Sequence, residues 1–226
     1  MSDLATALLA RLDAGFSTSR DPVRATAMAA YMRDQFPYFG LASPALRSLV
    51  RTATAGLPRP TVSDLRAIAL ACWARDEREF QYVACDYLRK HVAVADAGFL
   101  PVARTLIVTK SWWDTIDPLA TRFVGDLVRA HPSLSAAMDE WSGDDNKWVV
   151  RTAILHQLHY GAATDTDRLF AYCVRQAGHP DFFVRKAIGW ALRHYARTDP
   201  EAVRGFVVAH SDVLSPLSVR EASKHL

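Results

Sequence analysis

Apolar residues recur along this chain every three or four positions, and proline, glycine, serine, threonine or aspartate interrupt the pattern. This spacing is typical of amphipathic helices, and the interrupting residues are those that begin and end helices. No stretch sustains an alternation of apolar and polar residues, and no Asn-Gly pair marks a hairpin. The pattern therefore predicts an all-α protein of about a dozen helices. Their approximate spans are 2–13, 21–36, 43–55, 61–74, 77–92, 97–107, 112–130, 133–142, 146–160, 165–177, 181–197, 199–209 and 216–225.

Three of these segments share a pattern: an aromatic start, a small residue, aliphatic positions at helical spacing, and a basic or aromatic end. They are "EFQYVACDYLRKH", "KWVVRTAILHQLHY" and "FFVRKAIGWALRHYA". Aligning them on Ala84, Ala153 and Ala187 gives separations of 69 and 34 residues. A period of about 34 residues built from helix pairs is the signature of an α-solenoid. We therefore expect one domain over residues 1–226, curved so that it has a concave face.

The same period relates three charged residues. Asp117, Arg151 and Arg185 are each 34 residues apart. Because equivalent positions of successive repeats project from one face, we expect these side chains to line a common groove. The alternative is that both arginines are solvated helix residues, as most arginines are.

Composition limits the possible functions only loosely. The net charge of +3 and the pI near 8.8 are compatible with a polyanionic partner, and arginine outnumbers lysine 22 to 5. The three cysteines, Cys72, Cys85 and Cys173, lack CxxC spacing, so we expect buried free thiols in a cytoplasmic protein. No apolar run approaches the roughly 20 residues that span a bilayer, and the acidic start does not resemble a signal peptide.

Residues 109–117, "TKSWWDTID", combine bulky aromatic rings with carboxylates at a predicted helix start. Ser111 and Asp114 have the spacing of a capping box, which gives Asp114 a structural role. Trp113 and Asp117 are i and i+4, so they share a helix face, whereas we expect Trp112 to turn into the core.

An aromatic face beside a carboxylate favours positive charge, the ring through its quadrupole and the acid through Coulomb attraction. Cleavage of an N-glycosidic bond develops an oxocarbenium-like sugar, which such a pair would stabilise. Asp117 could also orient the attacking water, and flanking arginines could hold phosphates. The alternative is a structural ion pair between Asp117 and Arg151, with the tryptophan covered by the neighbouring repeat.

Six blocks of the chain resemble, in order and nearly over its full length, the AlkD family of DNA alkylation-repair glycosylases. These blocks are "AAYMRDQFPYFG", "EREFQYVACD", "IVTKSWWDTID", "DDNKWVVRTAIL", "KAIGWALRHYARTDP" and "PLSVREASKHL". The resemblance implies HEAT-like repeats with a basic concave face that binds double-stranded DNA. It also implies a monomeric, monofunctional glycosylase without metal or cofactor that excises cationic purines such as 7-methylguanine and 3-methyladenine. The lesion would stay stacked, without base flipping, so neutral lesions should be poor substrates.

The resemblance also assigns roles to residues. The catalytic aspartate of the family falls on Asp117, and its two partner tryptophans fall on Trp113 and Trp190. The arginine that grips the DNA backbone falls on Arg151, and a duplex-contacting tyrosine falls on Tyr31. Core packing is the alternative for Trp190 and Tyr31. Further phosphate contacts are expected from Lys110, Lys147, Arg185 and Lys186.

The chain departs from the family pattern at Ala42, where a polar residue is usual, and in its short C-terminal end. His156 and His159 are i, i+3 but lack a third ligand nearby, so a metal is not expected. The rival function is a non-catalytic HEAT-like scaffold for DNA or protein. A groove that exposes Asp117 between Trp113 and Trp190 would favour the enzyme, whereas burial of Asp117 against Arg122 or another core partner would refute its catalytic role.

Overall fold

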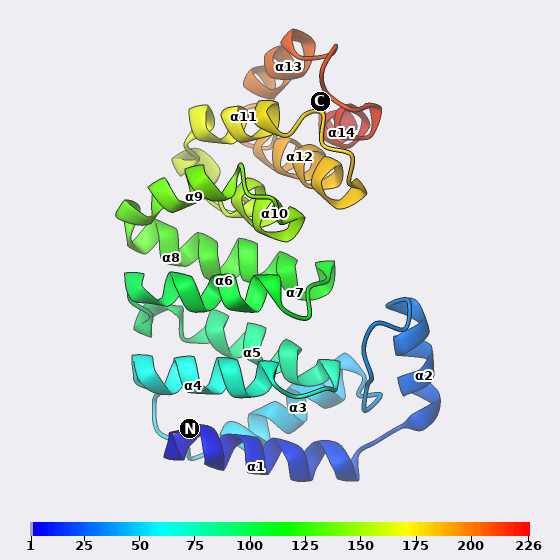
Figure 1. Cartoon of the computed structure of the whole chain (residues 1–226), viewed down its shortest axis with the longest axis vertical. Coiled ribbons are helices and arrows are strands. Elements are labelled where there is room, and N and C mark those ends of the chain that lie inside the picture. The colour runs from blue at the N-terminus through cyan, green and yellow to red at the C-terminus, as the bar shows by residue number, and fades with distance from the viewer. Residues whose placement is uncertain (1) are drawn as a thin grey trace. The chain divides into compact units, whose positions relative to one another are not determined.

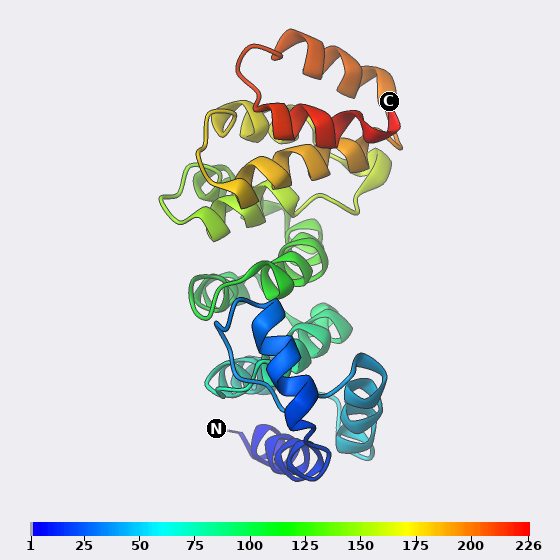
Figure 2. The same cartoon turned by 90° about the vertical axis from the view of Figure 1, so that its right-hand side faces the viewer.

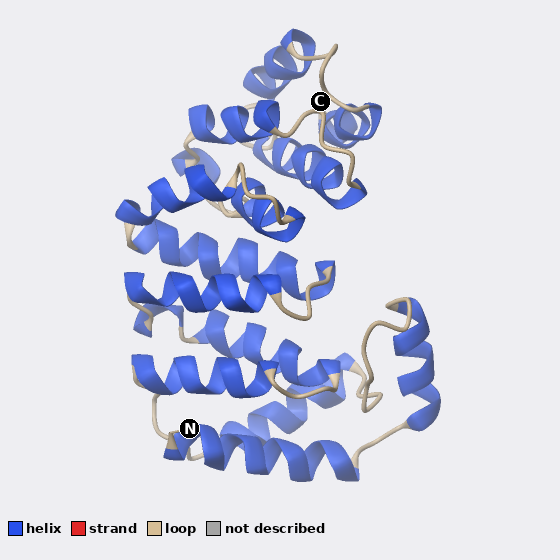
Figure 3. Ribbon diagram, viewed as in Figure 1, coloured by secondary structure: helices blue, strands red, loops and turns tan. Residues whose placement is uncertain are grey.

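The computed structural model of the chain describes residues 2–226, and every regular element in that range is a helix (Figure 3). The all-α prediction is therefore confirmed. The contacts divide the chain into two compact units, which end and begin at Val102 and Ala103, inside helix α6 (Leu100–Val108). Within the described residues, no helix is long and apolar enough to cross a lipid bilayer.

The first unit is built from helices packed side by side around an aromatic core (Figure 1). α1 packs against α3 and α4, and α4 packs against α5. Fully buried Phe16 meets Phe39 and Phe80 with ring centroids 5.6 and 5.2 Å apart. Edge-to-face and tilted contacts of this kind add to the free energy gained from apolar burial. The helices are α1 (Asp3–Thr18), α2 (Pro22–Tyr31), α3 (Ser43–Thr54), α4 (Val62–Trp73) and α5 (Arg78–Lys90).

Helix α2 is an exception to this packing, because it runs across α1 and α4 and has no buried residue (Figures 1 and 2). It ends earlier than its predicted span because Arg33 and Asp34 take positive φ angles of 58° and 55°. The loop after it is held by fully buried Glu79, whose carboxylate accepts hydrogen bonds from three backbone N–H groups of residues 39–41. Tyr31, at the end of α2, is 72% exposed.

The second unit is built around α10 and α12, which pack against each other. α10 also contacts α7, α9 and α11, and α12 contacts α13 and α14. Ala153 and Ala187, aligned by the repeat, are completely buried on α10 and α12, as Ala84 is on α5 of the first unit. The helices after α6 are α7 (Trp113–Pro118), α8 (Gly125–Ala130), α9 (Ser135–Trp141), α10 (Lys147–Leu155), α11 (Thr166–Arg175), α12 (Phe182–Tyr195), α13 (Pro200–Ala209) and α14 (Pro216–Ala222).

Between α7 and α8 the chain forms a π-helical turn, η3 (Leu119–Val124). Pro118 immediately precedes it and has no N–H to donate to the preceding turn, so the usual hydrogen-bond ladder is interrupted there. The Thr121 hydroxyl donates to the carbonyl of Asp117 at 2.8 Å. Asp117 therefore lies where the helix changes its winding, a local geometry that often accompanies functional sites.

All thirteen predicted spans overlap an observed helix, and the span 112–130 comprises α7, η3 and α8 without a loop. The buried free thiols are also confirmed at Cys72, Cys85 and Cys173. The prediction of a capping box between Ser111 and Asp114 is wrong, because α7 begins at Trp113 without a side-chain cap. Ser111 instead donates its hydroxyl hydrogen to the carbonyl of Ile107, at 2.6 Å.

Candidate active site

A cleft in the second unit gathers side chains from α7, α10 and α12. It has a volume of about 290 Å³ and is open to solvent. Five of the residues that the sequence singled out for catalysis or DNA contact share it, together with two phenylalanines and one further cation. The lining residues are Trp113, Asp117, Arg151, Phe182, Phe183, Lys186, Trp190 and Arg193.

Asp117 lies near the C-terminal end of α7, and its side chain is 19% exposed. Arg151 donates to both of its oxygens, Nε to Oδ1 at 2.7 Å and Nη2 to Oδ2 at 2.9 Å. Burial raises the pKa of Asp117 above its ordinary value, and the hydrogen bond and charge of Arg151 oppose that rise. Each carboxylate oxygen keeps further lone-pair capacity, so the paired acid can still accept a hydrogen bond from a water in the cleft.

The position of the Arg151 guanidinium differs from the expectation that it reaches a phosphate. Its side chain is only 4% exposed, and its third donor, Nη1, bonds the carbonyl of Phe183 at 2.5 Å. The guanidinium carbon lies 5.8 Å from the ring centroid of Trp190. In this structure Arg151 therefore holds Asp117 and supports Trp190 instead of projecting towards a ligand.

The aromatic residues separate into two groups. Trp112 packs inward, as expected, with its ring 5.9 Å from that of Trp148 and 5.1 Å from that of Phe183. Trp113 and Trp190 line the cleft instead, which places an indole from α7 and an indole from α12 near one carboxylate. The arrangement can therefore stabilise a cation between Asp117 and the two rings.

The predicted phosphate contacts lie in several places. Lys186 lines the cleft, whereas Lys147 is not among the lining residues; it pairs with Asp181 at 2.8 Å and lies over the rings of Trp148 and Phe183. Arg185 is absent from the lining residues, and Lys110 lies on the loop before α7 with a positive φ of 49°.

Sequence reasoning missed Phe182, Phe183 and Arg193. Arg193 could have been found from its i, i+3 relation to Trp190, which places both side chains on one face of α12. The two phenylalanines stand in the first turn of α12, and their place in the cleft depends on how α12 packs against α10.

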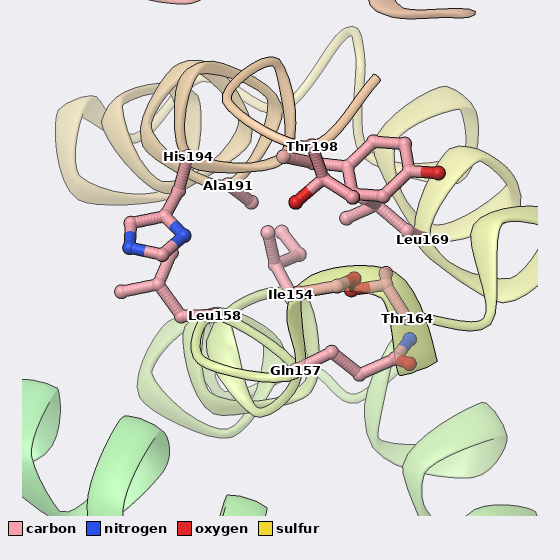
Figure 4. Close-up of a pocket in the computed structure, with 10 residues that line it drawn as sticks. Ile154, Gln157, Leu158, Thr164, Leu169, Ala191, His194 and Thr198 are labelled. Atoms are coloured by element: carbon pink, nitrogen blue, oxygen red, sulfur yellow. Dashed lines mark hydrogen bonds between the residues drawn. The ribbon is translucent and has the colours of Figure 1, made fainter.

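A second cavity, enclosed between α10, α11 and α12, is too small for a substrate (Figure 4). Its volume is about 10 Å³, enough for roughly one water molecule. Ile154, Leu158 and Leu169 contribute apolar walls, and His194 faces it from α12 (Figure 4). His156 is buried with its Nδ1 at 2.7 Å from the carbonyl of Ala153, and the side chains that the structure describes contain no cluster of His, Cys, Asp or Glu placed to hold a metal.

Comparison with known proteins gives a consistent assignment. A family model for DNA alkylation repair enzymes matches residues 12–226. A solved structure from Enterococcus faecalis, a predicted DNA alkylation repair enzyme, is 31% identical, with a TM-score of 0.85 over 92% of this chain and 97% of that chain. The structure of smu.31 from Streptococcus mutans UA159 is 16% identical, with a TM-score of 0.59 over 74% of this chain and 86% of that chain, and supports the fold alone. No curated protein matches the chain. From the family match and the Enterococcus likeness together, the chain belongs to the DNA alkylation repair enzyme family.

Proposed function

We propose that this protein is a monofunctional DNA glycosylase that releases cationic alkylated purines, such as 7-methylguanine and 3-methyladenine, from double-stranded DNA. The observation that carries the proposal is the carboxylate of Asp117, oriented by Arg151 in a cleft that Trp113 and Trp190 also line. Membership of a DNA alkylation repair family supports DNA as the partner. The cleft supplies the groups that this chemistry needs.

Asp117 would stabilise the sugar as positive charge develops and would orient the attacking water. A carboxylate about 4 Å from the sugar cation gives ~4 kcal/mol at an effective dielectric constant of ~20, and a guanidinium about twice as far offsets ~2 kcal/mol. Each indole face adds roughly 0.5–2 kcal/mol. The total is on the order of 3–6 kcal/mol, or about 10²–10⁴ in rate.

Arg151 would serve this chemistry by keeping the acid charged. Because burial favours the protonated form of Asp117, an unpaired acid at this position would lose its charge more readily as the pH falls. The bidentate contact also fixes the plane of the carboxylate, which reduces the reorganisation needed when the sugar cation forms.

The titratable groups of the cleft point to cationic bases as substrates. Its lining contains one carboxylate, Asp117, which is paired, and the cations Arg151, Lys186 and Arg193. No carboxylic acid therefore remains in the lining to protonate the base of a neutral lesion as it leaves. A cationic alkylated purine needs no such acid, because it leaves as a neutral base.

The lining also favours approach from the sugar-phosphate side, with the base left in the duplex. Enzymes that flip a base read its Watson–Crick edge with hydrogen bonds inside a pocket. The lining of this cleft has aromatic rings and cations but no amide or free carboxylate to read such an edge, because Asp117 is committed to Arg151 and to the reaction.

The ion pair between Asp117 and Arg151 is also the observation that favours the second candidate, a DNA-binding scaffold in which the pair only stabilises the fold. Base release from a duplex with a single 7-methylguanine separates the two functions. We expect the wild-type protein to generate an abasic site and Asp117→Asn to lose most of this activity while still binding duplex DNA. Binding without base release by the wild-type protein would identify the scaffold.

A further inference from the structure

One buried carboxylate behind the cleft serves three cations. Glu221, on α14, is 3% exposed. It accepts hydrogen bonds from Arg193 Nη1 at 2.6 Å and Lys224 Nζ at 2.7 Å, and the ammonium group of Lys186 lies 2.8 Å from it. The hydrogen bonds of Lys186, and next those of Lys224, lower the pKa of Glu221 to about 2. The acid is therefore ionised throughout the physiological range, and the cluster of four groups carries a net charge of +2.

The approach of α14 to α12 explains how a carboxylate reaches this place. Gly189 leaves the space, because a Cβ atom there would lie 2.4 Å from the Cβ of Glu221 and 2.8 Å from the carbonyl oxygen of Ser218. The Ser218 hydroxyl donates to the carbonyl of Arg185 at 2.9 Å and adds a second contact between the helices. Glu221 therefore lies directly behind the turns of α12 that carry Trp190.

Lys186 and Arg193 are seven residues apart and flank Trp190 on α12. Both line the cleft, and their side chains are 36% and 22% exposed. An ammonium group has three N–H donors and a guanidinium has five. The contacts with Glu221 use only part of this capacity, so both cations can still donate to an anion in the cleft.

We propose that Glu221 is a positioning residue that holds Lys186 and Arg193 as a two-point binding site for backbone phosphates of duplex DNA on either side of the reacting sugar. The proposal rests on the proposed function for its partner. Without Glu221, the like charges of Lys186, Arg193 and Lys224 would repel one another, and the long side chains would lose their common orientation. A carboxylate that only added negative charge would weaken DNA binding, because it would repel the phosphates.

The test is the salt dependence of binding to undamaged duplex DNA by the wild-type protein and by Glu221→Gln. The slope of log K against log salt measures the number of neutralised phosphates, at about 0.9 per contact for B-DNA. We expect the variant to bind more weakly than the wild-type protein and its slope to fall by up to about 1.8, the value for two contacts. Stronger binding by the variant would overturn the proposal, since it would show that Glu221 acts only through its charge.

A double-substitution background separates positioning from simple stabilisation of the fold. In a Lys186→Met, Arg193→Met protein, we expect Glu221→Gln to leave the slope unchanged, because no phosphate contact remains for it to position. An equal further loss in that background would show that Glu221 acts through another part of the protein. Lys224→Met is the matched control, since Lys224 bonds Glu221 but does not line the cleft, and we expect it to keep the wild-type slope.

The proposed function can fail independently of this inference. A wild-type protein that binds duplex DNA but releases no base would refute the glycosylase, whereas the slopes would still report on Glu221. If the wild-type protein shows no salt-dependent binding to duplex DNA, the phosphate site itself is refuted. Circular dichroism and thermal unfolding of each variant at the binding temperature ensure that folded protein is compared.

Discussion

Removing the charge of Asp117 should damage stability and base release by different amounts, and a second substitution should separate the two losses. In Asp117→Asn, the guanidinium of Arg151 stays buried without its counter-ion, since its side chain is 4% exposed. Breaking a buried ion pair in this way costs roughly 3–5 kcal/mol. For a chain of this size, each kcal/mol lowers the melting temperature by about 2–4 °C, so we expect a fall of roughly 6–20 °C.

The expected loss of rate follows from the same charges. The wild-type pair stabilises a sugar cation by a net ~2 kcal/mol, whereas the unpaired Arg151 of the variant would repel it by about the same amount. The difference of ~4 kcal/mol corresponds to a rate about 10³-fold lower, measured as single-turnover release of 7-methylguanine. The rate must be measured well below the melting temperature of the variant.

The charge-balanced variant Asp117→Asn, Arg151→Met removes both partners. Because no buried charge remains, we expect most of the lost stability to return, apart from about 1 kcal/mol for the Phe183 carbonyl that loses its donor. The rate should stay at least about 30-fold below wild type, since the net stabilisation of ~2 kcal/mol and the acceptor for water are both gone.

These two variants distinguish a catalytic acid from a structural ion pair. If the pair only stabilises the fold, restoring stability in the double variant would also restore base release. Recovery to within about threefold of the wild-type rate would therefore refute the catalytic role of Asp117. A single variant that keeps the wild-type rate while folded would refute it as well.

Three further predictions concern the pH profile and the helix contacts. Burial raises the pKa of Asp117, and only its charged form stabilises the sugar cation. Single-turnover base release should therefore fall, as the pH is lowered, at a pH above the pKa of an ordinary aspartate. A rate that stays constant down to the pKa of an ordinary aspartate would contradict this role. Glu79→Ala should lower the free energy of unfolding in urea by about 3 kcal/mol or more, because three buried backbone N–H groups lose their acceptor. An effect below about 1 kcal/mol would show that water replaces the carboxyl group. Gly189→Ala should lower the free energy of unfolding by roughly 1–3 kcal/mol in the same assay, because the added methyl group would overlap Glu221. Gly205→Ala is the control: a Cβ atom there has no neighbour within 4 Å, so the substitution should be neutral or stabilising by up to about 1 kcal/mol.

The sequence could predict the helices because their signals are local. Apolar spacing, prolines and capping residues act within a few positions, and all thirteen spans overlap observed helices. The shared face of Trp113 and Asp117 is equally local, since it needs only one turn of helix. The predicted span 21–36 extends past the observed end of α2 at Tyr31, because the left-handed conformation of Arg33 and Asp34 is rare for residues other than glycine and leaves no sequence signal.

Features that depend on contacts between helices were harder to predict. Glu221 lies 28 residues from Arg193, and its burial depends on Gly189 leaving room for α14. A single acidic residue is ordinarily solvated, so the sequence offers no reason to separate Glu221 from the other glutamates.

The 34-residue period relates the positions of Asp117, Arg151 and Arg185, but it does not by itself describe the site. Equivalent residues of adjacent repeats can lie close enough to touch, and Asp117 and Arg151 do so at 2.7 Å. Because their charges are opposite, the two side chains pair with each other instead of both facing a ligand. Arg185, one period further on, has no such partner in the cleft, and its Nε is buried without a hydrogen bond among the residues that the structure describes. In this chain the preceding repeat carries the acid, so Arg151 pairs with Asp117, and we propose that phosphate binding falls instead to Lys186 and Arg193, which Glu221 of α14 contacts.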